Sequence, residues 1–228
     1  MLGDHLVSAQ QAAHKWLREM ILSGELPAGQ ALRQEEMARR LGISRLPIRE
    51  ALNRLATEGL VELKPRRGFY VASLNIDEIE DIFEMRAMLE ARAGHLATER
   101  MTAADADAVD RCVAELDAVV AASTNFDHYA QLNIRFHERL FESCARKHLR
   151  RQIAMLRDAV SPLIRILASE KGELQRAQRE HRLLAKHFRE GHSERVAELS
   201  REHCAYTARA LIQKLRRGGV EEKAAAAS

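Results

Sequence analysis

Three histidines in the second half of the sequence share their helical stripes with apolar residues. Apolar side chains recur every three or four positions there, and His137, His181 and His203 fall in register with them. Asn133 stands one helical turn before His137, and Arg86 stands among apolar residues of an earlier segment. Polar groups inside a helical bundle must be satisfied by hydrogen bonds or by a ligand. The pattern therefore predicts a polar site in an otherwise apolar interior.

A single inward histidine is usually a hydrogen-bonded core residue, so each histidine alone says little. Three imidazoles from three helices, with an oxygen donor beside one of them, are typical of a metal site in a bundle core. We therefore predict a divalent metal ion of the zinc, nickel or manganese class, held by Asn133, His137, His181 and His203.

Helices are the elements that must position these residues. Residues 75–217 contain a single proline, Pro162, and read as about six helices. A capping box of Thr102 and Asp105 opens the second of them. Gly218 and Gly219 are expected to end the last. The predicted helices are 77–100, 102–121, 126–144, 147–167, 174–190 and 193–217.

The first third of the chain has a different organisation. Helical periodicity covers residues 8–22 and 34–41, and a third helix follows Ser44 as its N-cap, with Pro47 in its first turn. Two short strands, 60–63 and 68–71, flank a basic loop. Two helices joined by a glycine turn and followed by a hairpin predict a winged helix-turn-helix domain.

Arginines occupy the two parts of this domain that reach DNA. Arg45 and Arg49 share one face near the start of the second helix of the motif, where recognition helices contact base edges. Arg66 and Arg67 lie at the tip of the hairpin and could reach phosphate or the minor groove.

These segments resemble a known family. The run Ala31-Leu-Arg-Gln-Glu-Glu-Met-Ala-Arg-Arg-Leu-Gly-Ile-Ser-Arg-Leu-Pro-Ile-Arg-Glu-Ala-Leu-Asn-Arg-Leu-Ala-Thr-Glu-Gly-Leu-Val61 and the wing Arg67-Gly-Phe-Tyr-Val71 resemble the DNA-binding domain of GntR-family bacterial regulators. The resemblance implies a role at the operator for the recognition-helix arginines, for the region of Arg33 and for the wing. The predicted DNA-contacting residues are Arg33, Ser44, Arg45, Pro47, Arg49, Arg66, Arg67 and Gly68.

The second half resembles the FCD domain, the effector-binding half of FadR-type GntR regulators. The matching motifs are Asn133-Ile-Arg-Phe-His137, Glu180-His181-Arg-Leu-Leu184, His203 and Glu84-Met-Arg-Ala-Met-Leu-Glu90. Six helices suggest the VanR-like branch. The family usually has Asp at the position of Asn133, so this site carries one negative charge fewer. In the family the metal and an inward arginine hold the carboxylate of a small organic acid, which assigns that role to Arg86.

Composition is consistent with a two-domain, mainly α protein. Of the 228 residues, 1–72 contain 11 Lys and Arg against 8 Asp and Glu, whereas 73–228 contain 25 of each. We predict a DNA-binding domain at 1–72, a short linker at 73–76, a helical effector- and metal-binding domain at 77–219 and a flexible tail at 220–228. No charge-free stretch is long enough to span a membrane, and the three widely spaced cysteines suggest free thiols.

The leading functional hypothesis is a cytoplasmic, ligand-responsive transcription regulator, expected to be a repressor. A homodimer would present two recognition helices to a palindromic double-stranded operator. The alternative is a metal-dependent enzyme in which the three histidines leave open positions to activate water. Against it, Glu180 is expected to point away from the histidines, and Glu90 is a weak candidate for a general base. A purely architectural DNA-binding protein would need no inward polar cluster.

Overall fold

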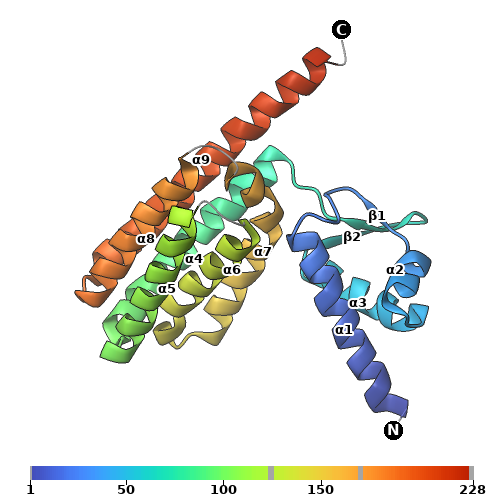
Figure 1. Ribbon diagram of the computed structural model, residues 1–228, viewed down its shortest axis with the longest axis horizontal. Coiled ribbons are helices and arrows are strands. Elements are labelled where there is room, and N and C mark those ends of the chain that lie inside the picture. The colour runs from blue at the N-terminus through green and yellow to red at the C-terminus, as the bar shows by residue number, and fades with distance from the viewer. Residues whose placement is uncertain (1, 123–125, 169–171, 226–228) are drawn as a thin grey trace. The chain divides into compact units, whose positions relative to one another are not determined.

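The chain folds into two compact units, residues 1–75 and 76–228, in the computed structural model shown in Figure 1. The structure describes residues 2–122, 126–168 and 172–225. The first unit combines helices with a small sheet, and the second is built of helices. The predicted fold class, mainly α with a winged helix-turn-helix and a helical bundle, is confirmed.

Three helices form the body of the first unit: α1 (Leu2–Leu22), α2 (Gln34–Leu41) and α3 (Arg45–Thr57). Their apolar stripes meet in one core, in which Leu17, Ile48 and Leu52 are fully buried. The turn between α2 and α3 contains Gly42, whose φ of 65° is the left-handed conformation that glycine tolerates best. This turn sets α3 as the second helix of the helix-turn-helix.

A three-stranded antiparallel sheet forms the wing, with strands in the order β1-β3-β2. β2 (Val61–Lys64) and β3 (Gly68–Val71) pair as the predicted hairpin, with Leu63 opposite Phe69. β1 (Ala31–Leu32) pairs with the other edge of β3 and was not predicted. Two residues carry no alternating pattern of their own, so only the tertiary pairing defines this strand.

Six α-helices make up the described part of the second unit, and their order is the predicted one. A short 3-10 helix, η1, covers Glu142–Cys144, where the sequence predicted a continuation of the third helix. The bundle core includes Phe136, Phe188 and Leu116. All three cysteines are free and buried. The helices are α4 (Ile76–Arg100), α5 (Ala103–Ala122), α6 (Phe126–Leu140), α7 (Lys147–Ala168), α8 (Glu173–Arg189) and α9 (Ser193–Ala225).

Local signals set several of these boundaries. The Thr102 hydroxyl accepts a hydrogen bond from the Asp105 amide at 3.2 Å, and the Asp105 carboxylate accepts one from the Thr102 amide at 2.8 Å. This is the predicted capping box at the start of α5. The Ser44 N-cap is placed as predicted, but no hydrogen bond from its side chain caps α3.

The end of α9 differs from the prediction. The helix continues through Gly218 and Gly219 to Ala225, so these glycines do not end it and residues 220–225 are helical. Each glycine costs a helix about 1 kcal/mol relative to alanine. The following Glu221, Glu222, Lys223 and alanines are strong helix formers, which offsets that cost. Residues 226–228 of the predicted tail lie outside the described residues.

No helix in the described part of the chain is both long and apolar enough to cross a membrane.

Helices α4 and α9 make the most extensive contact of the bundle and run side by side in Figure 1. Gly94 of α4 lies at this contact, where an added Cβ would sit 3.0 Å from Cγ1 of Val196 and 3.3 Å from Oγ of Ser200. The missing side chain lets the two helices approach closely.

We expect Gly94→Ala to lower the free energy of unfolding by about 1 kcal/mol, because overpacking outweighs the gain in helix propensity. Urea denaturation measures this. Adding Val196→Ala to Gly94→Ala removes Cγ1 of Val196, the atom nearest to the new Cβ. The double variant should therefore be more stable than the sum of the two single effects predicts. A Gly94→Ala protein more stable than wild type would contradict close packing at this position.

Candidate metal centre and DNA-binding surface

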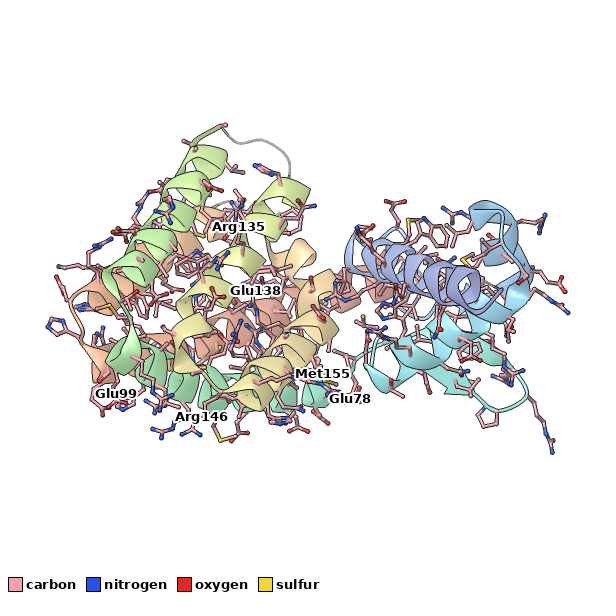
Figure 2. The ribbon with its side chains drawn as sticks, turned by 90° about the horizontal axis from the view of Figure 1, so that it is seen from below. Glu78, Glu99, Arg135, Glu138, Arg146 and Met155 are labelled. Atoms are coloured by element: carbon pink, nitrogen blue, oxygen red, sulfur yellow. The ribbon has the colours of Figure 1, made fainter. Side chains whose placement is uncertain are left out.

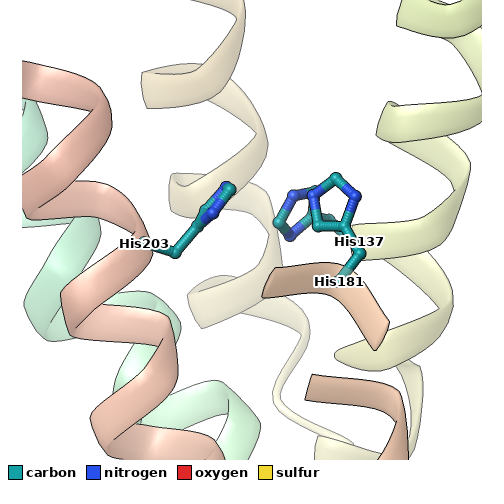
Figure 3. Close-up of side chains that lie close together, drawn as sticks. All are labelled: His137, His181 and His203. Carbon is teal, nitrogen blue, oxygen red and sulfur yellow. The ribbon is translucent and has the colours of Figure 1, made fainter. Parts of the chain in front are cut away.

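The three predicted histidines converge in the bundle interior from α6, α8 and α9. Their ring centroids form a nearly equilateral triangle, 5.2 Å between His137 and His181, 5.3 Å between His181 and His203, and 5.4 Å between His137 and His203. One ring nitrogen of each lies within 4.8 Å of the others. Figure 3 shows the rings of His137 and His181 side by side, with His203 facing them. The three side chains are 0–8% exposed.

Two nitrogens of this cluster are buried without a hydrogen-bond partner among the described residues, Nδ1 of His137 and Nε2 of His181. A buried polar atom left unpaired costs about 1–3 kcal/mol. Two such atoms on neighbouring rings are available to bind one shared ligand. The donor set therefore fits a metal ion.

Outer hydrogen bonds orient two of the rings. Nδ1 of His181 lies 3.2 Å from Oε1 of Gln178, whose amide nitrogen donates to the Val113 carbonyl and to Asp117. The amide nitrogen is thus engaged as a donor, so the contact to Oε1 requires a proton on Nδ1 of His181. The bare lone pair is then on Nε2, which turns inward. Such outer partners commonly fix the tautomer of a metal-binding histidine.

Glu180 gives His203 the same support. Its Oε2 lies 2.6 Å from Nδ1 of His203, and Arg176 donates to its other oxygen. Burial raises the pKa of Glu180, but the hydrogen bonds from His203 and Arg176 outweigh it and lower that pKa, so Glu180 is an anion that accepts a hydrogen bond from His203. The prediction that Glu180 points away from the cluster is wrong. Its side chain is long enough to cross from α8 to α9, although its neighbour His181 occupies the inward position.

Burial also keeps His137 and His181 neutral. Loss of solvation, and next the charges of Arg157 and His181, hold the pKa of His137 well below its usual value. Burial followed by His203 and Arg157 does the same to His181. Neutral imidazoles keep the lone pair that a metal ion needs, without competition from a proton.

Asn133 lies half-buried one turn before His137 on α6.

Arg86 is buried as predicted, but it already has a counter-ion. Its Nε donates to Oε1 of Glu90 at 2.9 Å, one turn further along α4, and both side chains are at least nine-tenths buried. Burial opposes both charges, yet their attraction raises the pKa of Arg86 and lowers that of Glu90. Glu90 was named only as a weak general base. The pairing follows from the i, i+4 spacing, which sequence reasoning could have used.

Arg157 of α7 is the residue that sequence reasoning missed. Its charge acts on His137, His181 and Glu90. Burial, only partly offset by Glu90, lowers its pKa. No hydrogen bond or salt bridge to Arg157 is found among the described residues. It falls between apolar positions of α7, as Arg86 does on α4, and that signal was overlooked.

Arg157 also lines a groove of about 520 Å³ formed by α6, the two residues that flank η1 and the first half of α7. Lys147, Arg150 and Arg151 lie on the same groove, opposed by Glu138, which Figure 2 labels on α6. Four cationic side chains against one carboxylate suit an anion. By contrast, charged side chains such as Glu99 and Arg146 lie on the outside of the unit (Figure 2).

The predicted DNA-contacting residues of the first unit are exposed, with two exceptions. Arg45 and Arg49 stand one turn apart on α3, and Arg45 pairs with Glu35 of α2. Pro47 is buried in the core of the unit, so its side chain does not belong to this surface. Gly68 is half-buried at the start of β3. The exposed members are Arg33, Ser44, Arg45, Arg49, Arg66 and Arg67.

The wing tip holds an arginine in an unusual backbone conformation. Arg66 has a φ of 61°, in a turn closed by the hydrogen bond from the Arg67 amide to the Lys64 carbonyl at 3.0 Å. A left-handed conformation costs a residue with a side chain about 1–2 kcal/mol, and glycine would avoid that cost. Glycine at this position would make the turn more stable, so the arginine is retained at a cost in stability.

Comparison with known proteins agrees with this architecture. Residues 9–71 match the bacterial regulatory proteins of the gntR family, and residues 81–206 match the FCD domain. The chain therefore belongs to the GntR family of transcription regulators, among those that carry an FCD domain.

Individual relatives support the same class. The chain is 35% identical over 153 residues to an uncharacterised HTH-type regulator of Agrobacterium vitis, and this match covers 64% of this chain and 86% of that protein. It is 30% identical to the Escherichia coli HTH-type transcriptional repressor GlaR, over 60% of this chain and 63% of GlaR. The match to Bacillus subtilis YdhC, 27% identical over 63% of this chain, spans 64% of that regulator.

The fold is that of solved regulators. E. coli McbR/YncC superposes with a TM-score of 0.80 at 22% identity, over 91% of this chain and 98% of that one. Because the family and its named members are DNA-binding transcription regulators, the protein is not an enzyme.

We expect Glu90→Leu to lower the free energy of unfolding by about 3–5 kcal/mol, because it leaves buried Arg86 without its counter-ion. Arg86→Met should cost less, since Glu90 still faces the charge of Arg157. The double variant Arg86→Met/Glu90→Leu should recover most of the loss. Chemical denaturation of metal-free protein measures all three. A double variant as unstable as the sum of the singles would contradict a structural ion pair.

Proposed function

We propose that this regulator represses its target genes as a homodimer on a palindromic operator, and that a small carboxylate bound beside a divalent metal ion releases it. The observation that carries the proposal is the grouping of unpaired groups in one interior site. Two histidine nitrogens lack partners among the residues that the structure describes, and the charge of Arg157, for which no ion pair is found there either, acts on both rings.

His137, His181 and His203 would hold the metal, with Asn133 as a further oxygen donor. Three neutral nitrogens suit zinc and nickel best, and a neutral amide oxygen in place of a carboxylate weakens the case for a hard ion such as manganese. Three or four protein ligands leave coordination positions open. The metal would supply those positions and a positive charge to a carboxylate oxygen.

Arg157 is the better candidate than Arg86 to meet the effector. The charge of Arg86 is balanced by Glu90 at 2.9 Å, whereas Arg157 has no such partner among the described residues. A guanidinium binds a carboxylate through two parallel hydrogen bonds. The cationic groove beside Arg157 favours an acid with more than one carboxylate. Arg86 and Glu90 would then maintain the shape of the pocket.

The operator would be contacted by α3 and the wing. Arg45 and Arg49 are placed to read base edges or clamp phosphates, and Arg66 and Arg67 to contact the backbone or the minor groove. The strained backbone of Arg66 supports a role for its side chain. Arg45 would exchange Glu35 for DNA on binding.

The chain path suggests how the site and the DNA-binding unit communicate. α4 begins at Ile76, directly after the residues that follow β3, and it carries both Arg86 and Glu90. A carboxylate that binds Arg157 would alter the charges around α4, because the charge of Arg157 acts on Glu90. A shift of this helix would pass through residues 72–75 to the wing. Because the regulator is proposed to bind operator DNA, we propose that the protein is cytoplasmic.

The DNA contacts can be tested with an operator selected from genomic fragments by the wild-type protein. Arg49→Ala and Arg45→Ala should each weaken specific binding by roughly tenfold or more, as expected for loss of a base or phosphate contact of about 1–3 kcal/mol. Fluorescence anisotropy at fixed salt measures the affinity. Arg54→Ala is the matched control, because Arg54 lies at the far end of α3 and pairs with Glu58. Equal losses in all three variants would argue against the recognition-helix assignment.

The metal and effector are tested together by thermal shift. We expect zinc or nickel to raise the unfolding temperature of the wild type, and a di- or tricarboxylate to raise it further, since both bind the folded state only. His137→Ala should abolish both shifts, whereas Arg157→Gln should keep the metal shift and lose the carboxylate shift. If Arg157→Gln responds like the wild type and Arg86→Met does not, the effector contact belongs to Arg86.

A further inference from the structure

A second group of metal-binding side chains lies at the junction of α8 and α9, away from the interior site. Nδ1 of His187, Nδ1 of His192 and Oε2 of Glu190 face one another on the surface of the helical unit. The two nitrogens are 3.1 Å apart, and the carboxylate oxygen lies 3.2 Å from His187 and 3.1 Å from His192. The three atoms form an almost equilateral triangle.

The backbone of the turn holds the two imidazoles together. The amide of Gly191 donates to the Phe188 carbonyl at 3.1 Å, and the amide of His192 donates to the His187 carbonyl at 3.0 Å. With Gly191 at a φ of 74°, this is a Schellman motif at the end of α8. The motif brings the third-last helical residue, His187, against the second residue after the C-cap Glu190, His192, and this contact is usually apolar. Here both positions are histidines, and Glu190 lies between them.

The size of the triangle fits a first-row transition ion. Ligand atoms about 2.0–2.1 Å from a shared ion are about 2.9 Å apart at a right angle and about 3.4 Å apart at the tetrahedral angle. The separations of 3.1–3.2 Å fall between these values. No rearrangement of the turn is needed to bring all three atoms to one ion.

Hydrogen bonds alone leave one side of the triangle unsatisfied when both rings are neutral. If each Nδ1 carries a proton and donates to Glu190, the two nitrogens meet as two donors at 3.1 Å. If His187 donates to His192, the accepting nitrogen has no proton for Glu190, and a lone pair faces a carboxylate; the reverse case is equivalent. A divalent cation satisfies all three contacts at once.

Neighbouring charges leave the carboxylate oxygen available. Lys186 lies 4.0 Å from the other oxygen of Glu190, and Arg189 is engaged by Asp107 and Asp110 of α5. His192 is 58% exposed and His187 22%, so an ion can enter from solvent and keep water as further ligands.

We propose that His187, Glu190 and His192 form a second divalent-metal site, of the zinc or nickel class, that fastens the turn between α8 and α9. His187 belongs to α8 and His192 immediately precedes α9, the helices that carry His181 and His203. An ion here would clamp the junction of two of the three helices that build the interior site. The proposal does not depend on the interior site being occupied.

Zinc stoichiometry of the untagged full-length protein tests this site. After equilibrium dialysis against micromolar zinc, elemental analysis should find two ions per chain in the wild type and one in His192→Ala. His137→Ala should also retain one, and the double variant none. His148→Ala, an exposed histidine of α7, is the control and should retain two. Circular dichroism checks that each variant keeps its helix content.

The outcomes separate the two sites. Loss of one ion in His192→Ala but not in His137→Ala supports the surface site and counts against the interior one. Equal zinc content in His192→Ala and wild type overturns the surface site, as does an equal loss in the His148→Ala control. In the His137→Ala background, zinc should raise the unfolding temperature, and adding His187→Ala should abolish that shift. A shift that survives in this double variant also overturns the proposal.

Discussion

Charged and polar groups inside a helical bundle must find partners, and this requirement shapes the whole second unit. Arg86 meets Glu90, His203 meets Glu180, and Gln178 connects His181 to α5. Each contact crosses a helix–helix boundary or spans one turn, so the polar groups help to set how the helices pack. Within the described ranges, no partner is found for one nitrogen each of His137 and His181 or for the guanidinium of Arg157, and we propose a ligand for these groups. We therefore expect the paired groups to serve stability and propose that the others bind a ligand.

The same principle explains why the effector assignment moves from one arginine to another. Resemblance to the family pointed to Arg86 because its motif on α4 is recognisable. A buried guanidinium with a carboxylate at 2.9 Å has little charge left to offer an anion. The charge of Arg157 acts on the neutral His137 and His181 and on Glu90, and Arg157 also lines the cationic groove. An anion entering there would relieve electrostatic repulsion and would not have to displace an existing partner.

The DNA-binding unit follows a different logic, since its functional side chains face solvent. The apolar stripes of α1, α2 and α3 leave the arginines outside, and the capped turn at Gly42 sets the angle between the two helices of the motif. Pro47 shows the limit of transferring roles along a motif, because it belongs to the core of the unit. At the wing, the backbone of Arg66 retains a conformation that opposes stability, which is common where a side chain is needed for binding.

The sequence by itself determined the helices, the helix-turn-helix, the wing hairpin and the inward histidines. These features depend on periodicity, caps and glycine turns, which act over a few neighbouring residues. Only the tertiary structure decided the pairing of β1 with β3, the contact of Glu180 with His203, the electrostatic effect of Arg157 on the histidines and the continuation of α9 past two glycines. The first three depend on which helices and strands become neighbours in space. The fourth is a balance of small propensities that no single residue reveals. The position of a residue on the apolar stripe of its helix indicates that its side chain turns inward. Its partner often comes from another helix, and we expect that partner to decide whether the residue serves stability or binding.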